Sequence, residues 1–485
     1  MINAVQNLLR LLPRLVPLIL GAYLLYAALA ALVPYALPRK TGKAYRDRHK
    51  ARRFYGDGSV DRAALVEAPL DAFVQRIQLI REAKDTLDVV YHCVKPGCTT
   101  AYFFGELLRA AKRGVKVRLI LDGKVGGMGG DRRQFAYALA IHPNICYRIY
   151  NPVGMRTPWK WNTLLHDKFI LVDDRLLLLG GRNIGDEYFA PPSHTGRVVY
   201  DRDVLVFNTA YGTSGRESVL FQVKDYMEEL WKHRDTKRAC CVRSASKRAI
   251  GKRKTGELLG NLAALEEDYP EVKAVVADYA AVTRPCNRIQ LLRNPLDTSK
   301  KEPWVGYSLT LLAGSAQEEA LVQTPYCTGS RCILNALRTV ARNIPGKLTM
   351  LTNSPASSPN PVAFSNYMAN RRRILGTGTR VLEYQSKGSI HGKSVLIDGR
   401  LSAVGSFNLD ARSIYIDTET MLVIDSPAFY GDLRQAVDNF SAESLELETP
   451  GRYKPGKIVA RKRSPLKGAV LWLFSIFSEL IRFLI

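Results

Sequence analysis

The sequence lacks the cysteine pattern of a zinc site. Its eight cysteines are scattered over 485 residues. Three close pairs do not repeat the two-residue spacing of zinc-binding motifs: Cys93/Cys98, Cys240/Cys241 and Cys327/Cys332. We therefore interpret the cysteines as ordinary thiols, with at most an occasional disulfide.

Acidic residues are scarce. Asp and Glu number 45 against 70 Lys and Arg, which gives a formal net charge of +25. This excess favours an anionic partner, such as nucleic acid, an acidic lipid surface or a phosphate-bearing substrate, but does not choose among them. Aromatic residues are missing from the basic runs, where a groove for single-stranded nucleic acid would need them for base stacking, so nucleic acid is the less favoured partner.

Charge is absent from Leu15 to Leu37. About 20 helical residues cross a bilayer, so this stretch predicts a membrane anchor. A cleaved signal peptide is the alternative, because Ala28 and Ala30 form a small-residue pattern, but the apolar run is longer than a usual signal core. Two basic residues precede the span, and eight follow it between residues 39 and 53. The positive-inside rule therefore predicts a cytoplasmic domain after a single N-terminal span in the cell membrane.

The rest of the chain alternates helix and strand patterns, which predicts an α/β fold. The segment DAFVQRIQLIREA reads as a helix, TLDVVYHCV as a strand, FFGELLRAAKRG as a helix and VKVRLILDG as a strand. We divide the chain into an anchor with its basic juxtamembrane segment, a first half, a basic inter-lobe segment, a second half and a basic tail, with these ranges: 1–55, 56–236, 237–286, 287–446 and 447–485.

The tail ends in an apolar stretch, SPLKGAVLWLFSIFSELIRFLI, that is interrupted by Glu479 and Arg482. It is short for a membrane span, and a basic run lies just before it. Basic flanks beside Trp472 and Phe477 favour a helix lying in the membrane interface. The alternative is a helix packed on the protein's own core.

One motif occurs twice. HDKFILVDDRLLLLGGRN begins at His166, and HGKSVLIDGRLSAVGSFN begins at His391. Each histidine is followed at the same spacings by a lysine, an aspartate and an asparagine: Lys168, Asp173 and Asn183, then Lys393, Asp398 and Asn408. The small residues Gly180-Gly181 of the first copy match Gly405-Ser406 of the second. Further along, DRDVLVF resembles DTETMLV, which places Asp203 opposite Glu419. The similarity indicates an internal duplication.

Strand geometry explains the spacing. Residues two apart point to the same side of a strand, so the histidine and lysine of each copy project together. Asp173 and Asp398 complete the motif and belong to its candidate catalytic set with the histidines and lysines. Their odd separation from the histidine places them on the other side of the strand or at the turn, where we interpret them as structural. An antiparallel neighbouring strand returns Asn183 or Asn408 toward the histidine.

The combined residues suit phosphoryl chemistry. A neutral imidazole can attack phosphorus while an imidazolium protonates the leaving oxygen. Ammonium and amide donors stabilise the charge on the phosphoryl oxygens. Two copies that face one phosphodiester would supply the nucleophile and the acid on opposite sides of it. The resulting double displacement would pass through a covalent phosphohistidine. A metal site is the competing interpretation, but an ammonium cannot ligate a metal. The remaining histidines have no repeat partner and are interpreted as non-catalytic: His49, His92, His142, His194 and His233.

These residues resemble the paired histidine–lysine–aspartate motif of the phospholipase D superfamily, from about residue 65 to 445. GGRNIGDEYF and VGSFNLDARS resemble bacterial cardiolipin synthases, particularly the class C type. The resemblance implies a bilobal α/β/α fold of two pseudo-symmetric halves, catalysis without a metal or other cofactor, and exchange of phosphatidyl groups between alcohols.

The resemblance also implies residue roles. His166 would be the nucleophile and His391 the acid/base, although the pseudo-symmetry leaves their order open. Lys168, Lys393, Asn183 and Asn408 would bind phosphate, and Asp203 and Glu419 would orient the imidazoles. Asp186, Glu187 and Tyr188 would line the mouth of the site with Gly185. Asp417 stands where asparagine is expected, which puts the acceptor preference in question.

Three functions fit this pattern. The first is synthesis of cardiolipin, with phosphatidylglycerol as acceptor and phosphatidylglycerol or phosphatidylethanolamine as donor. The second is a membrane-attached phospholipase D, phosphodiesterase or nuclease. The third, a lipid-binding scaffold with a dead site, is disfavoured because both motif copies are complete.

Overall fold

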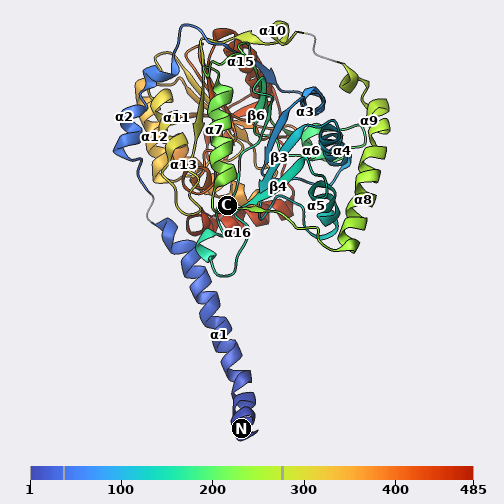
Figure 1. Ribbon diagram of the computed structural model, residues 1–485. Helices are drawn as coiled ribbons and strands as arrows, with labels where there is room; N and C mark the ends of the chain where they lie inside the picture. Colours follow the sequence, from blue (N-terminus) through green and yellow to red (C-terminus); the bar gives the residue numbers. More distant parts are fainter. Residues whose placement is uncertain (1, 37–38, 275–277, 484–485) are drawn as a thin grey trace.

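The computed structural model describes residues 2–36, 39–274 and 278–483 (Figure 1). The predicted anchor falls on helix α1, Ile2–Ala36, and its last residue, Leu37, lies outside the described residues. The helix leaves the body of the molecule as a single rod (Figure 1). Its stretch Leu15–Tyr35 is long and apolar enough to cross a membrane, by length and composition.

The first half contains a mixed nine-stranded sheet. Its order is β10-β1-β8-β6-β5-β2-β3-β4-β9. The strands are β1 Asp61–Val66, β2 Thr86–Tyr91, β3 Lys116–Asp122, β4 Ile145–Tyr150, β5 Phe169–Val172, β6 Leu176–Gly180, β8 Asp203–Asn208, β9 Thr236–Arg238 and β10 Arg284–Pro285. Strands β2, β3 and β4 are parallel, and β5, β6 and β8 are antiparallel to their neighbours.

The second half repeats this arrangement. Its sheet has the order β11-β18-β17-β16-β12-β13-β14-β19-β20. The strands are β11 Arg288–Arg293, β12 Ala320–Gln323, β13 Leu348–Asn353, β14 Arg380–Tyr384, β16 Lys393–Ile397, β17 Leu401–Gly405, β18 Thr420–Asp425, β19 Ser444–Thr449 and β20 Arg452–Tyr453. The strand order β1-β8-β6-β5-β2-β3-β4 in the first sheet matches the order β11-β18-β17-β16-β12-β13-β14 in the second. The duplicated sequence therefore gives a duplicated fold.

The two sheets share one core. Leu171, Leu177 and Val204 of the first sheet belong to the same buried cluster as Leu396 and Val404 of the second. Helices α7, Val219–Lys232, and α15, Pro427–Ala442, bury their apolar faces in this cluster. Because each sheet turns an apolar face to the other, the motif strands β5 and β16 are held on opposite sides of one interface.

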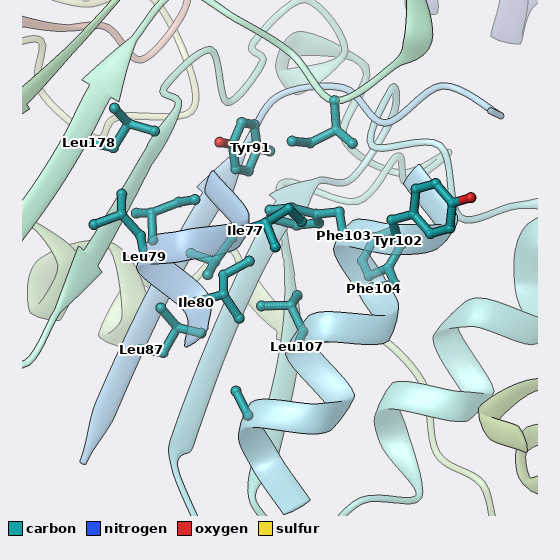
Figure 2. Close-up of a cluster of buried hydrophobic side chains, with 14 of the residues drawn as sticks. Ile77, Leu79, Ile80, Leu87, Tyr91, Tyr102, Phe103, Phe104, Leu107 and Leu178 are labelled. Atoms are coloured by element: carbon teal, nitrogen blue, oxygen red, sulfur yellow. The ribbon is translucent and has the colours of Figure 1, made fainter. Parts of the chain in front are cut away.

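Helices cover the outer face of each sheet, as the alternating pattern predicts. The first sheet carries α3 Pro69–Glu82, α4 Cys98–Lys112 and α5 Arg133–Ala140, and the second carries α11 Trp304–Ala313, α12 Arg331–Asn343 and α13 Pro361–Leu375. Figure 2 shows the core below α3 and α4, where Ile77, Ile80 and Phe104 pack with Leu87 of β2. The structure is thus the mixed α/β fold that the sequence predicts.

The basic inter-lobe segment forms helices α8, Ala245–Gly260, and α9, Leu262–Asp268. They pack on α4 and α5 of the first half. In the tail, β19 and β20 extend the second sheet, and α16, Pro465–Ile481, lies against α13.

Helix α16 has two different faces. Leu471 and Ser478 are buried against the body, whereas Trp472, Ile476 and Phe477 are at least half exposed. Asn366 of α13 donates to the backbone oxygen of Ser478 at 3.1 Å. The helix therefore packs on the protein with one side and presents apolar side chains with the other, at the end of the body from which α1 leaves (Figure 1).

Candidate active site

Each motif histidine is hydrogen-bonded to a carboxylate from the opposite half. Nδ1 of His166 lies 3.0 Å from Oε1 of Glu419, and Nδ1 of His391 lies 2.5 Å from Oδ2 of Asp201. An ionised carboxylate can only accept, so each contact favours the tautomer with its proton on Nδ1 and the lone pair on Nε2. Both imidazoles are therefore oriented by the interface between the halves.

Two short backbone crossings bring the halves together. Leu165, just before His166, forms a parallel bridge with Thr418, just before Glu419. Strand β15, Ser389–Ile390, pairs in parallel with β7, Val199–Tyr200, just before Asp201. Because the crossings correspond residue by residue, Asp201 and not Asp203 is the counterpart of Glu419.

The expectation that Asp203 orients a histidine is wrong. Its carboxylate lies 3.0 Å from guanidinium nitrogens of both Arg76 and Arg182, and all three side chains are buried. In the sheet, Asp203 pairs with Gly180, whereas the matching Gly405 pairs with Met421. The match of DRDVLVF with DTETMLV therefore lies two residues out of the structural register.

The motif lysines occupy equivalent positions beside the histidines. Lys168 donates to the backbone oxygen of His166, and Lys393 donates to that of His391 at 2.5 Å. Nζ of Lys393 is also 3.4 Å from Asp201 and 2.6 Å from Nδ1 of His391. Both lysine side chains are buried, so their positive charges are concentrated at the centre of the interface.

Burial and these charges keep both imidazoles neutral. Desolvation, followed by the charges of Lys168 and Lys393, holds the pKa of His166 well below its ordinary value. Desolvation and Lys393 lower the pKa of His391 to about 4, against the opposing charge of Asp201. A neutral imidazole with a free Nε2 is the form that can attack phosphorus.

The two orienting carboxylates differ in pKa. The ammonium of Lys393 and the ring of His391 hold the pKa of Asp201 far below its ordinary value, despite its burial. Burial raises the pKa of Glu419 to about 7. Asp201 is thus ionised at neutral pH, and its charge is available to stabilise an imidazolium at His391.

Asn183 and Asn408 follow the hairpins β5–β6 and β16–β17, as expected from antiparallel pairing. Nδ2 of Asn183 donates to Oη of Tyr188 at 3.1 Å. The side-chain oxygens of both asparagines are buried, and neither has a hydrogen-bond partner within the described residues. Each of these amide oxygens can accept a hydrogen bond from a ligand.

Asp173 and Asp398 do not contact the histidines. The Asp173 carboxylate accepts backbone N–H groups of Lys84, Asp85 and Thr86, at 2.6 to 3.0 Å. Asp398 accepts those of Gln317, Glu318 and Glu319, at 2.8 to 3.0 Å. Each aspartate ties the turn after its motif strand to the neighbouring strand, which agrees with a structural role and not with a catalytic one.

The residues expected at the mouth of the site, together with Ser406, differ in their distance from the histidines. Asp186 accepts the N–H of Thr99 at 3.1 Å, at the start of α4, and Glu187 pairs with Lys95. Only Tyr188 comes near a motif histidine, with its ring centre 5.8 Å from that of His391. Ser406 donates to Glu419. Of these four residues, Tyr188 lies beside His391 and Ser406 contacts Glu419. Asp186 instead caps helix α4, and Glu187 pairs with Lys95.

The sequence did not indicate two neighbours of the histidines, Asp201 and Tyr326, and a third neighbour, His92, was expected to lie outside the site. The ring of His92 is 4.8 Å from that of His166, and its Nδ1 is 2.7 Å from the Leu165 oxygen. The ring of Tyr326 is 6.2 Å from that of His391. His92 and Tyr326 follow the ends of β2 and β12, which pair with the motif strands β5 and β16. Their position just after a predicted strand was the sequence signal that could have indicated them. Among the described residues, no group of His, Cys, Asp and Glu could hold a metal ion.

Known proteins share this architecture. The family description "Cardiolipin synthase, PLD-like domain" matches residues 76–208 and 309–441, one match in each half. Cardiolipin synthase C of Escherichia coli K12 is 29% identical over 402 residues, which cover 74% of this chain and 80% of that protein. An uncharacterized protein of Helicobacter pylori is 26% identical over 424 residues, 79% of this chain and 80% of that protein.

A solved structure has the same fold. Phosphatidylserine synthase of Haemophilus influenzae Rd KW20 superimposes with a TM-score of 0.60 at 16% identity, over 91% of this chain and 100% of that chain. Together, the two family matches, the duplicated sheets and the paired histidines show that this chain belongs to the cardiolipin synthase family with phospholipase D-like domains.

Proposed function

We propose that this protein is a membrane-attached phosphatidyltransferase that makes cardiolipin through a phosphohistidine. The acceptor is phosphatidylglycerol, and the donor is phosphatidylglycerol or phosphatidylethanolamine. The observation that carries the proposal is the exchange of carboxylates between halves, Glu419 to His166 and Asp201 to His391. This exchange fixes both imidazoles at one interface, and the relatives named cardiolipin synthase support the choice of product.

In the first step, Nε2 of His166 attacks the donor phosphorus. A nitrogen–phosphorus bond forms, the bond to the headgroup oxygen breaks, and His391 gives that oxygen a proton. Burial and the nearby lysines keep His166 neutral and nucleophilic. His391 is suited to carry the proton because its partner Asp201 is ionised. The bound phosphodiester anion adds a negative charge that favours protonation of His391.

In the second step, a hydroxyl of phosphatidylglycerol attacks the phosphohistidine. His391 takes the hydroxyl proton, the new phosphorus–oxygen bond forms, and the bond to His166 breaks. Lys168, Lys393, Asn183 and Asn408 bind the phosphoryl oxygens in both steps, and their donors stabilise the charge of each transition state. Water in place of the alcohol would give phosphatidic acid, so the two outcomes differ only in the attacking oxygen.

Three elements support a position of this chemistry at a bilayer. Helix α1 spans it, with the catalytic halves on the cytoplasmic side, as the basic residues after the span indicate. The exposed face of α16 lies in the interface, where Trp472 and Phe477 suit the headgroup region. Exposed Met155 lies in a loop whose backbone accepts a hydrogen bond from Tyr23 of α1 at 2.8 Å, so this loop also meets the membrane.

A product assay tests the proposal. The full chain in detergent is incubated with labelled phosphatidylglycerol, with and without phosphatidylethanolamine, and with single-stranded DNA in a parallel tube. We expect cardiolipin together with free glycerol or ethanolamine. Phosphatidic acid as the sole product would identify a hydrolase, and shortened DNA would identify a nuclease.

Variants and a chelator test the mechanism in the same assay. His166→Ala and His391→Ala should each abolish turnover, whereas His194→Ala, at a half-buried histidine outside the two motifs, should leave it unchanged. EDTA should have no effect, because the lysines supply the positive charge at the phosphate. Loss of activity in EDTA would contradict a mechanism carried by protein groups alone.

A further inference from the structure

A partly open apolar cavity lies in the second half, away from the histidines. Its volume is about 470 Å³, and it lies between α11, α12 and the outer face of the second sheet. Its walls include Ala313 of α11, Leu337 and Val340 of α12, and Val322 and Val395 of the sheet. The volume falls within the range of about 300 to 1,000 Å³ that is typical of small-molecule sites. The motif histidines, lysines and asparagines are not among its lining residues.

The mouth of the cavity is basic. Arg39, Lys40 and Arg46 contribute to its lining, and all three are exposed. Arg39 lies 3.8 Å from an exposed carboxylate of Asp297. Within the part of the chain that the structure describes, no ion pair involves Lys40 or Arg46. An apolar interior below uncompensated cations matches a ligand with a hydrocarbon chain and an anionic head.

The mouth is held in place by packing. The ring of Tyr45, in helix α2, Lys43–Arg48, stacks on Trp304 at the start of α11, with ring centres 4.7 Å apart. The N–H of Gly42 donates to Glu302 at 2.8 Å. These contacts fix the segment that carries Lys40 and Arg46 over the first turn of α11, so the cations and the cavity form one built site.

The mouth also lies close to the membrane anchor along the chain. The apolar stretch of α1 ends at Tyr35, and Lys40 follows only five residues later. Five residues reach at most about 18 Å when fully extended. Tyr35 is buried against the body, so Lys40 stays close to the point where the anchor joins the protein, within reach of lipids that surround the anchor.

We propose that this cavity binds one acyl chain of an anionic phospholipid, with the lipid phosphate between Lys40 and Arg46. Each buried methylene contributes about 0.8 kcal/mol to such binding, and the cations select for negative charge. The site is separate from the proposed reaction centre. Its inner wall nevertheless includes Val395, two residues after Lys393, and Leu409, next to Asn408. A bound chain therefore packs against the strand and loop that carry two phosphate-binding residues.

Photo-cross-linking tests this site independently of catalysis. The full-length His166→Ala variant is reconstituted into phosphatidylcholine vesicles that contain phosphatidylglycerol with a diazirine on one acyl chain. We expect cross-linked peptides from α11 and α12. Cross-links confined to α1 and α16 would overturn the proposal and leave the proposed reaction untouched, because this variant performs no turnover.

A variant that fills the cavity sharpens the result. Ala336 of α12 is half-buried and lines the cavity, so Ala336→Phe should abolish the cross-links on α11 and α12. Ala442→Phe, an exposed position at the end of α15, is the matched control and should retain them. Equal melting temperatures establish that both variants fold. Unchanged cross-linking in folded Ala336→Phe would contradict binding inside the cavity.

The charges at the mouth are tested with two probes. Lys40→Gln combined with Arg46→Gln should reduce cross-linking by the phosphatidylglycerol probe and not by a phosphatidylcholine probe. Lys43→Gln combined with Arg48→Gln removes the same charge from exposed residues of α2 outside the lining and should change neither. Equal losses with both pairs of substitutions would contradict a specific phosphate site.

Discussion

The carboxylate of Asp201 lies 2.5 Å from Nδ1 of His391, although the two residues belong to opposite halves of the molecule. The pairing of Glu419 with His166 is its pseudo-symmetric counterpart. Neither half can orient its own histidine, because each lacks the carboxylate that the other supplies. Assembly of the two sheets around their shared core is thus what completes the candidate site.

Asp201 and Asp203 should respond differently to the same substitution. Asp201→Asn removes the charge that stabilises an imidazolium at His391, so we expect kcat to fall at least about 100-fold with little change in melting temperature. Asp203→Asn leaves Arg76 and Arg182 without their buried counter-charge and should lower the free energy of unfolding by about 3 to 5 kcal/mol. Kinetics and denaturant unfolding of the two variants measure the contrast. Wild-type kcat in Asp201→Asn would refute the role given to that carboxylate.

The motif aspartates should prove to be structural. Asp173→Asn weakens three hydrogen bonds from backbone N–H groups, so we expect a loss of roughly 1 to 3 kcal/mol of stability. The kcat of the folded protein should stay at the wild-type level. Asp398→Asn is the matched change in the second half. A large loss of kcat at unchanged stability would instead place these aspartates in the chemistry.

Activity should decline as the pH rises through about 7. Burial, followed by the charge of Lys393, lowers the pKa of Lys168 to about 7. A lysine is charged below its pKa, so Lys168 loses the charge that binds phosphate as the pH rises. Arginine stays protonated throughout this range, so Lys168→Arg should remove the alkaline decline in kcat/KM or move it upward, even if its maximum is lower. An identical alkaline limb in the variant would assign the titration to another group.

The exposed face of α16 should contact lipid. Trp472 is 68% exposed, so its fluorescence should be quenched by phospholipids brominated on their acyl chains. The signal is obtained as the difference between the wild-type protein and Trp472→Phe in vesicles. Trp231, in the helix α7, provides an internal comparison through Trp231→Phe and should contribute no quenching. Absence of quenching at Trp472 would contradict an interfacial position for this helix.

The sequence predicted the centre of the site better than its surroundings. The repeated motif predicts that the histidines, lysines and asparagines lie together, because strand alternation and hairpin pairing depend on residues that are close along the chain. Asp201 follows Asn183 by 18 residues, whereas Glu419 follows Asn408 by 11. This difference in loop length conceals the correspondence, and a local match of DRDVLVF with DTETMLV chose the wrong aspartate.

Other features depend on tertiary structure alone. His92 has no sequence counterpart in the second half, and only the pairing of β2 with β5 places it beside His166. The apolar residues of α11 and α12 have the same pattern whether they fill a core or line a cavity. Helix α16 packs on the body with one side and leaves an apolar side exposed. Its sequence is apolar around most of its surface, so only packing decides which side is covered.

The central claim is that two imidazoles act on one phosphorus atom, and a crystal structure of the protein soaked with vanadate tests it most directly. We predict a single vanadium between the halves, bonded to Nε2 of His166, with Nε2 of His391 hydrogen-bonded to the opposite apical oxygen. Vanadate bound separately at each histidine, or at neither, would contradict the account.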